Sequence, residues 1–283
     1  MRILVTGSKG QLGAELVELL STQPHHEVLG LDLPEHDLCD RDLVLGAITQ
    51  WQPDAILHTA ALTDVDRCET EVELAYRVNA VATRFVADGA RRVGAHVVYV
   101  STDYVFDGLK AAPYVEWDEP NPRSVYGRTK LAGEREIDPG WTVARTSWLC
   151  GRHGPNMVTT LLRLAEERDE VAFVDDQVGH PTFAADLAPR LVKLAVERMP
   201  GVFHTTNTGA VSWYGFAREV FAAAGHDPDR VRPISTAELD PPRPAPRPAN
   251  SQLDNLAWRA HGFTPPRDFR EPLAELVAVL KGS

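Results

Sequence analysis

The stretch that decides the fold is MRILVTGSKGQLG, residues 1–13. Residues 2–6 form a short apolar and β-branched run that stops at Gly7, and the leucines of residues 11–20 then recur at helical spacing. A strand, a glycine turn and a helix in this order predict the first unit of a parallel α/β sheet that is covered on both faces.

Three glycines, Gly7, Gly10 and Gly13, make this turn a G-x-x-G-x-x-G motif. In a first strand-to-helix connection they allow a tight turn, a close approach of the backbone to a pyrophosphate, and tight packing of helix on strand. Amides at the helix N-terminus then face the anion. Glycine turns are common, but the position of this one predicts a dinucleotide-binding loop.

The cofactor expected in this loop is NADPH or NADH. Asp32 closes the expected second strand, residues 27–31, where an acidic side chain accepts hydrogen bonds from the adenosine ribose and favours NADH. Lys9 lies within the loop and offers a positive charge to the 2′-phosphate of NADPH. A plain surface-turn role for Asp32 also stays open.

Strands and helices continue to alternate through the first half of the chain. This predicts the α/β class, a Rossmann-like doubly wound parallel sheet with a smaller C-terminal substrate-binding lobe. We expect a dinucleotide-binding domain over residues 1–148, and a mainly substrate-binding lobe over residues 149–283 with some helices returning to the sheet. The further elements expected are helices 41–50, 71–92, 124–137, 156–168, 184–198 and 213–224, and strands 54–58, 96–100 and 141–146.

Composition excludes several classes of protein. The 283 residues carry 29 Lys and Arg against 40 Asp and Glu, a net charge of −11 that disfavours nucleic acid as a partner. No run approaches the roughly 18 apolar residues of a membrane helix, and the N-terminal apolar run is too short for a secretory signal, so we expect a cytoplasmic protein. Cys39, Cys68 and Cys150 form no C-x-x-C pair, which predicts reduced thiols rather than disulfides or a zinc site.

Candidate catalytic residues lie at the carboxyl side of the expected sheet. Tyr126 and Lys130 are four positions apart in VYGRTK, so their side chains share one helix face. A nearby ammonium and the oxidised nicotinamide lower a tyrosine pKa from its free value of about 10, which makes Tyr126 a candidate proton donor to a carbonyl. Thr102 follows strand 96–100 at the edge where ligands of such folds bind, and can donate to the same carbonyl. This spacing also occurs by chance, but the glycine loop and Thr102 together favour catalysis.

Longer stretches resemble a known family. The G-x-x-G-x-x-G and Y-x-x-x-K sets are similar to those of the extended short-chain dehydrogenase/reductase superfamily. More specifically, the chain resembles the dTDP-4-dehydrorhamnose reductase family. The stretches that carry this resemblance follow in order over nearly the whole chain: GSKGQLGAEL, AALTDVDRCE, STDYVFDG, NPRSVYGRTKLAGE, RTSWLCG, DDQVGHPT and RPAPRPANSQL.

The resemblance implies hydride transfer from the nicotinamide to C4 of a dTDP-linked 4-keto-6-deoxysugar, with Tyr126 supplying the proton. It implies that Thr102, Tyr126 and Lys130 are catalytic, and that Asp103 and Trp148 join Thr102 and Tyr126 around the sugar. Tyr126 and Lys130 would also meet the dinucleotide. The other residues that would line it are Gly7, Gly10, Gln11, Leu12, Gly13, Asp32, Asp37, Leu38, Ala60, Ala61 and Leu62.

Three positions depart from the family pattern. Leu62 stands where a tyrosine or histidine is frequent, Cys150 where a tyrosine is frequent, and Phe183 where a serine is frequent. Loss of polar groups at Leu62 and Cys150, which we expect near the pocket, leaves the sugar and its stereochemistry open. The alternatives are a ketoreductase for another deoxysugar of secondary metabolism, or a non-catalytic regulatory subunit that binds a dinucleotide.

Other polar residues have less specific interpretations. Arg243 and Arg247 lie among the prolines of residues 240–248 and suit a pyrophosphate, or form a solvated pair on a linker. Asn79 is expected to brace the backbone beside Lys130. Glu15 matches an acidic residue through which some relatives pair with Mg²⁺, but we predict a solvated glutamate, no metal, and a monomer or homodimer. The loop 175–181 is expected near the substrate or as an exposed turn, and His153, His180 and His204 as structural residues.

Overall fold

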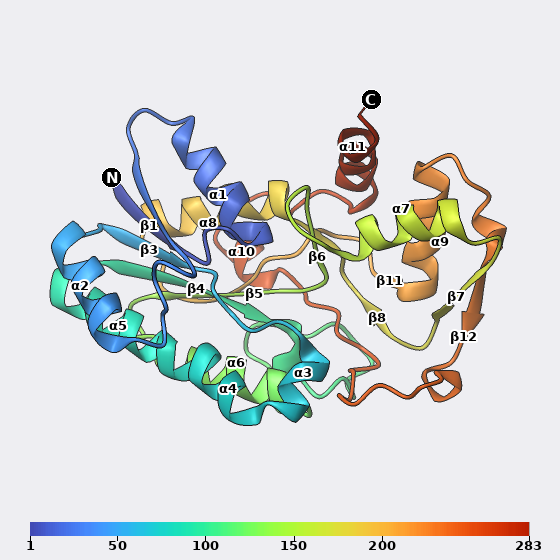
Figure 1. The fold of residues 1–283 in the computed structure, drawn as a ribbon, viewed down its shortest axis with the longest axis horizontal. Coiled ribbons are helices and arrows are strands. Elements are labelled where there is room, and N and C mark those ends of the chain that lie inside the picture. Colours follow the sequence, from blue (N-terminus) through green and yellow to red (C-terminus); the bar gives the residue numbers. More distant parts are fainter. Residues whose placement is uncertain (283) are drawn as a thin grey trace.

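In the computed structural model, which describes residues 1–282, a six-stranded parallel sheet forms the centre of the molecule (Figure 1). Its order is β10-β5-β4-β3-β1-β2, so the direction in which strands are added reverses between β1 and β3. In open parallel sheets, ligands bind at such a reversal, beyond the carboxyl ends of the strands. The strands are β1 (Arg2–Thr6), β2 (Glu27–Leu31), β3 (Ala55–His58), β4 (His96–Thr102), β5 (Thr142–Thr146) and β10 (Gly201–His204).

Helices cover both faces of this sheet because successive strand residues point to opposite faces. Ile3 and Val5 pack on one face with α1 (Gln11–Ser21) and α8 (Ala184–Val196). Leu4 packs on the other face with α2 (Arg41–Trp51) and α5 (Ala82–Val93). The α/β class and the parallel sheet are thereby confirmed.

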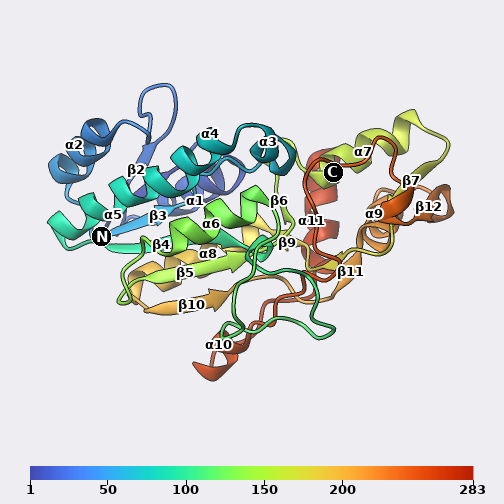
Figure 2. The same cartoon turned by 90° about the horizontal axis from the view of Figure 1, so that it is seen from below.

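A second hydrophobic core lies beside the sheet and is built from later parts of the chain (Figure 2). Phe216, Phe221 and Phe269 are fully buried in it. Its helices are α7 (Met157–Glu167), α9 (Trp213–Ala223) and α11 (Arg270–Lys281). Its short strands pair as β6 (Leu149–Cys150) with β9 (Thr182–Phe183), β7 (Val171–Val174) with β12 (Val231–Ile234), and β8 (Val178–Gly179) with β11 (Val211–Ser212).

Several element bounds differ from the expected ones. The expected helix 71–92 is α4 (Val72–Tyr76), a wider π-helical turn (Arg77–Val81) and then α5. The expected helix 124–137 is α6 (Val125–Glu134), which ends earlier. The elements that were not expected from the sequence include α3 (Val65–Thr70), β10, α10 (Leu256–Ala260) and α11. β10 and α10 have only four and five residues, too few for a clear period.

The part of the chain after residue 148 therefore supplies one strand of the sheet, β10, and one helix that packs on it, α8. The division into domains at residue 148 stays a prediction. Among residues 1–282, no helix is long and apolar enough to cross a membrane. Short 3₁₀ turns complete the elements at Asp103–Val105, Pro228–Arg230 and Thr236–Glu238.

Candidate active site

The glycine loop between β1 and α1 has room for a phosphate because side chains are missing there. Gly7 adopts a left-handed φ of 65°, and a Cβ on it would lie 2.8 Å from the Cα of Ala60. A Cβ on Gly13 would collide with the carbonyl oxygen of Gly7. No side chain caps α1 at Gly10. Its first amides are therefore available to an anion, and these residues fit the pyrophosphate of a dinucleotide.

Two polar contacts fasten the outer end of this loop. The carboxylate of Asp32 accepts hydrogen bonds from the amides of Lys9 and Leu33, both at 2.7 Å. The ammonium of Lys9 pairs with Glu35 at 2.7 Å, and both side chains are more than half exposed. Such an exposed pair contributes little stability, so Lys9 can exchange Glu35 for another anion.

The other residues expected at the dinucleotide lie where β2 and β3 end. Asp37 accepts from the amide of Cys39 at 2.8 Å, and Leu38 packs against the core under α2. Ala60, Ala61 and Leu62 follow β3. Ala60 lies directly against Gly7 of the glycine loop, and Leu38 and Ala60 pack in the same hydrophobic cluster.

Asn79 lies in the wide turn between α4 and α5. Its amide oxygen accepts from the amide of Leu62 at 2.7 Å, while its nitrogen donates to the Leu62 carbonyl and to the hydroxyl of Thr129. Asn79 thus contacts α6 directly beside Lys130, as expected, but through the Thr129 side chain, and the backbone that it braces is that of Leu62. Asn79 holds the segment after β3 against α6, because its one amide group is fully used by Leu62 and Thr129.

Thr102 and Tyr126 meet at the carboxyl end of β4. The Thr102 hydroxyl donates to Asp103 at 2.9 Å, accepts from the Tyr104 amide, and interacts with Tyr126. Tyr126 is only 9% exposed, and its ring meets that of Tyr104 edge-on at 5.6 Å. Gly127 permits this arrangement, because a Cβ there would collide with the Tyr104 carbonyl.

Lys130 lies deeper than Tyr126. Its ammonium donates to the Val100 carbonyl at 2.8 Å and lies 4.1 Å from the centre of the Tyr99 ring. Burial lowers the pKa of Lys130 to about 7, although the charge of Glu134 opposes this shift. Burial also raises the pKa of Tyr126. The expected lowering of the Tyr126 pKa is thus wrong for the ligand-free protein, where loss of water outweighs the hydrogen bond with Thr102.

A buried ion pair anchors α6 and was missed from the sequence. Glu134 accepts from the Ser101 hydroxyl at 2.5 Å and binds Arg145 through both carboxylate oxygens at 2.8 and 2.9 Å. Both charged side chains are less than a tenth exposed. The signal available was the position of Glu134, one turn after Lys130 on the same helix face.

The predicted sugar side of the site is formed by Asp103 and Trp148. Burial raises the pKa of Asp103 to about 6, against the effect of the neighbouring Ser251 and Thr102 hydroxyls. Its Oδ2 is buried without a hydrogen-bond partner among the described residues, as an acceptor for a ligand hydroxyl would be. Trp148 has a left-handed φ of 46° and stacks on Trp213 at 3.6 Å, at the junction of sheet and second core.

The three departures from the family pattern lie in different surroundings. Leu62 packs in the cluster that contains Tyr104 and Tyr126, as expected for a pocket residue. Cys150 and Phe183 are buried in the second hydrophobic core. The thiol of Cys150 donates to the carbonyl of Trp148 at 3.5 Å, so the expectation that Cys150 removes a polar group near the pocket stays a prediction.

Several other candidates have protein partners. Arg247 pairs with Asp66 at 2.7 Å. The prediction that Glu15 is solvated is wrong, because Glu15 is buried on α1 and binds Arg152 at 3.1 Å. His204 is fully buried and contacts the Tyr114 carbonyl, and burial lowers its pKa to about 3, which fits a structural role. The prediction of no required metal stays a prediction.

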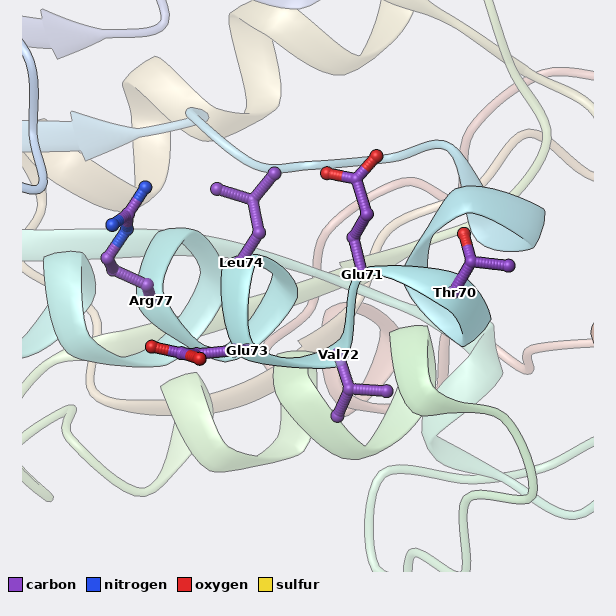
Figure 3. A pocket seen from close by; sticks show the side chains of 6 residues that line it. All are labelled: Thr70, Glu71, Val72, Glu73, Leu74 and Arg77. Atoms are coloured by element: carbon purple, nitrogen blue, oxygen red, sulfur yellow. The ribbon is translucent and has the colours of Figure 1, made fainter.

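A cavity of about 400 Å³ lies over α3 and α4, apart from the residues above (Figure 3). Glu71, Leu74 and Arg77 point to the side of α4 along which the segment leaving β3 runs. The cavity is lined by Thr70, Glu71, Val72, Glu73, Leu74 and Arg77, and none of the predicted site residues is among them.

The sheet reversal, the glycine loop and the Thr102, Tyr126 and Lys130 set define an extended short-chain dehydrogenase/reductase. The chain belongs to the family described as RmlD substrate binding domain, whose family model matches residues 1–281. A dTDP-4-dehydrorhamnose reductase of Streptomyces griseus is 43% identical, with 99% of this chain and 94% of the relative covered.

Two further proteins are similar over most of their length. A probable dTDP-4,6-dihydroxy-2-methyloxan-3-one 4-ketoreductase of Streptomyces antibioticus is 42% identical, with 97% of this chain and 94% of that protein covered. The crystal structure of a dTDP-4-dehydrorhamnose reductase of Bacillus anthracis in complex with NADP has a TM-score of 0.92 and 37% identity, and covers 97% of this chain and 98% of that one.

Proposed function

We propose that the chain is an NAD(P)H-dependent reductase that converts the C4 keto group of dTDP-4-dehydrorhamnose to the alcohol of dTDP-L-rhamnose. The observation that carries this proposal is the meeting of Thr102 and Tyr126 at the end of β4, with Lys130 one helical turn below. Family membership and the similarity to named dTDP-4-dehydrorhamnose reductases support the substrate class.

In this proposal NADPH or NADH supplies the hydride. Its pyrophosphate would be held by the glycine loop, through Gly7, Gly10 and Gly13 and the intervening Gln11 and Leu12. Its adenosine ribose would be held by Asp32. The further residues that would line the dinucleotide are Asp37, Leu38, Ala60, Ala61 and Leu62. The Bacillus anthracis complex supports NADP, and Lys9 offers this chain a charge for the extra phosphate.

The residues of this chain would handle the proton and the developing charge. Tyr126 would donate its hydroxyl proton to the substrate carbonyl oxygen, and Thr102 would stabilise the same oxygen as it becomes an alkoxide. The single proton of the Thr102 hydroxyl is given to Asp103 in the ligand-free protein. The substrate must therefore replace Asp103 as the acceptor, which makes Asp103 free to bind a sugar hydroxyl.

A second candidate is reduction of another dTDP-linked 4-keto-6-deoxysugar. Leu62 lies in the apolar cluster with Tyr126, where the family often has a tyrosine or histidine. The similarity to the Streptomyces antibioticus ketoreductase favours this alternative as well. A change of polarity beside the proton donor would alter which sugar hydroxyls are accepted.

We also propose that the protein acts in the cytoplasm as a monomer or homodimer and binds no nucleic acid. The cofactor supports the compartment, since NADPH and NADH serve enzymes there. The net charge of −11 supports the absence of a nucleic-acid partner.

The test follows the absorbance of NADPH and NADH after purified protein meets dTDP-4-keto-L-rhamnose, which is generated in place because it is labile. Rapid oxidation is expected, and the two rates give the cofactor preference. Binding of each dinucleotide is titrated separately. A protein that binds a dinucleotide but oxidises neither with this sugar contradicts the rhamnose assignment, and a panel of other 4-keto sugars then separates the second candidate from a regulatory role.

A further inference from the structure

A strap of nine proline-rich residues, 240–248, connects the second core with the sheet. The strap follows β12 and passes close to α3, as the orange to red trace of Figure 1 shows. Pro248 touches Gly108 so closely that a Cβ on Gly108 would lie 2.5 Å from the proline Cβ. Just beyond the strap, the Ala249 carbonyl accepts from the Val178 amide of β8.

One carboxylate ties this strap to α3. Asp66 accepts from the Ala245 amide at 3.1 Å and from the two terminal nitrogens of Arg247 at 2.7 and 2.8 Å. Both charged side chains are less than a quarter exposed, so water competes little for them. Arg247 holds the pKa of Asp66 below its ordinary value. This contact joins residues 181 positions apart in sequence.

The binding mode leaves one edge of Arg247 unused. A guanidinium has five N–H donors and can bind oxyanions through two different pairs of them. Asp66 takes one proton from each terminal nitrogen, and the Ala245 carbonyl takes a second from Nη1. The Nε–H and the remaining Nη2–H, which form the other bidentate edge, have no acceptor among residues 1–282.

Arg247 also lies beside the proposed reaction site. Its positive charge is close enough to Tyr104 to lower the pKa of that phenol, and the Tyr104 ring packs against that of Tyr126. Just past the strap, the Ser251 hydroxyl lies close enough to Asp103 to lower the pKa of its carboxyl group. A second guanidinium, Arg243, lies 3.6 Å from Asp66 and is mostly exposed. A local positive edge is needed here, because the protein as a whole repels anions with a charge of −11.

We propose that Asp66 is a positioning residue that holds Arg247 so that its free Nε and Nη2 edge binds the diphosphate of the nucleotide sugar. This rests on the proposed function, since it assigns a further contact to the same substrate. Asp66 does not touch the substrate. It fixes the rotamer and the charge of Arg247, and with it the strap that closes one side of the site.

The test uses dTDP as the probe and measures its dissociation constant by calorimetry on protein saturated with NADPH. Asp66→Asn keeps the shape but removes the charge, and we expect the Kd for dTDP and the KM for the keto sugar to rise about tenfold. The Kd for NADPH and the melting temperature are expected to stay close to those of the wild type, which shows that the variant folds. Glu71→Gln, which breaks an exposed pair with Arg67 beside the same helix, is the matched control and should leave dTDP binding unchanged.

A double-mutant cycle tests whether Asp66 acts through Arg247. In the Arg247→Gln background, Asp66→Asn should change the Kd for dTDP less than twofold, because the guanidinium it positions is gone. A full tenfold effect in that background, or wild-type dTDP affinity in Asp66→Asn alone, would overturn the inference while leaving the reductase proposal intact. A wild-type protein that binds no dTDP and oxidises no cofactor would instead overturn the proposed function, and this inference with it.

Discussion

Tyr126 and Lys130 lie one turn apart on α6, yet burial moves their pKa values in opposite directions. The phenol becomes a weaker acid and the ammonium a stronger one, because both lose water that favours their charged forms. The bound, positively charged nicotinamide would favour the phenolate. The ligand-free site is therefore set to keep the proton on Tyr126 until the substrate and cofactor arrive.

Tyr126→Phe tests the proton donor at this scale. The variant keeps the ring that packs on Tyr104 but lacks the hydroxyl, so kcat should fall by about 10²–10⁴-fold. The Kd for NADPH, followed by fluorescence titration, should change less than about threefold. Turnover near the wild-type rate would contradict the assignment of Tyr126 as the acid.

Lys130→Met tests the lowered pKa through stability. Between pH 7 and 10.5 the unfolded chain binds a proton at Lys130 that the folded chain has already released, so the free energy of unfolding rises with pH in this window. The variant lacks this gain. Urea unfolding of cofactor-free protein at pH 7 and pH 9 should show the wild type gaining about 2 kcal/mol relative to Lys130→Met. Equal pH dependence in both proteins would show that Lys130 is solvated.

At the scale of elements, α6 is held to the sheet at both of its ends. Near its N-terminus Gly127 allows contact with the Tyr104 backbone, and at its C-terminus Glu134 binds β4 through Ser101 and β5 through Arg145. The helix that carries Tyr126 and Lys130 is thus fixed against the strand that carries Thr102. The sequence motif predicted the helix, but not the strands to which Glu134 is bound.

Arg145→Met should destabilise the fold by about 3–5 kcal/mol, because it leaves the Glu134 carboxylate buried without its partner. Chemical denaturation gives this difference. The double variant Arg145→Met/Glu134→Leu should recover most of the loss, since no buried charge then remains unpaired. A fall of less than 1 kcal/mol in the free energy of unfolding of the single variant would show that water reaches Glu134 and that the ion pair does not stabilise the fold.

At the scale of the whole molecule, burial keeps four histidines neutral. Loss of water lowers the pKa of His58 and His204 to about 3, and that of His96 and His180 to about 4. Their pKa in the unfolded chain is about 6.5, so the unfolded state binds protons first as the pH falls. Stability should therefore decrease from pH 6.5 towards pH 4, against the smaller opposite effect of Asp103.

Thermal melts at pH 7, 5.5 and 4.5 measure this dependence, and the melting temperature should fall at each step. His58→Gln isolates one contribution: it should flatten the profile below pH 6.5 relative to the wild type. A constant melting temperature down to pH 4.5 would contradict the neutral, buried state of these histidines.

Much of the fold is decided by contiguous residues. The glycine spacing after the first strand demands a backbone that only glycine allows, and the alternation of apolar runs with helical periods predicts a parallel sheet. Tyr126 and Lys130 were placed correctly on their helix, and Thr102, which was expected just after strand 96–100, is the last residue of β4. The relative positions of residues within one helix or strand follow from their spacing in the sequence.

Only the tertiary structure decided the rest. β10 becomes the sixth strand because β5 offers it an open edge, and neither partner is visible in the four residues of β10 itself. The bonds from Asn79 to Leu62, from Glu134 to Arg145 and from Asp66 to Arg247 join different elements, over 17, 11 and 181 positions of chain. The depth of burial that sets the pKa of Lys130 and Tyr126 also depends on these distant neighbours, because desolvation is a property of the surrounding atoms and not of the residue alone.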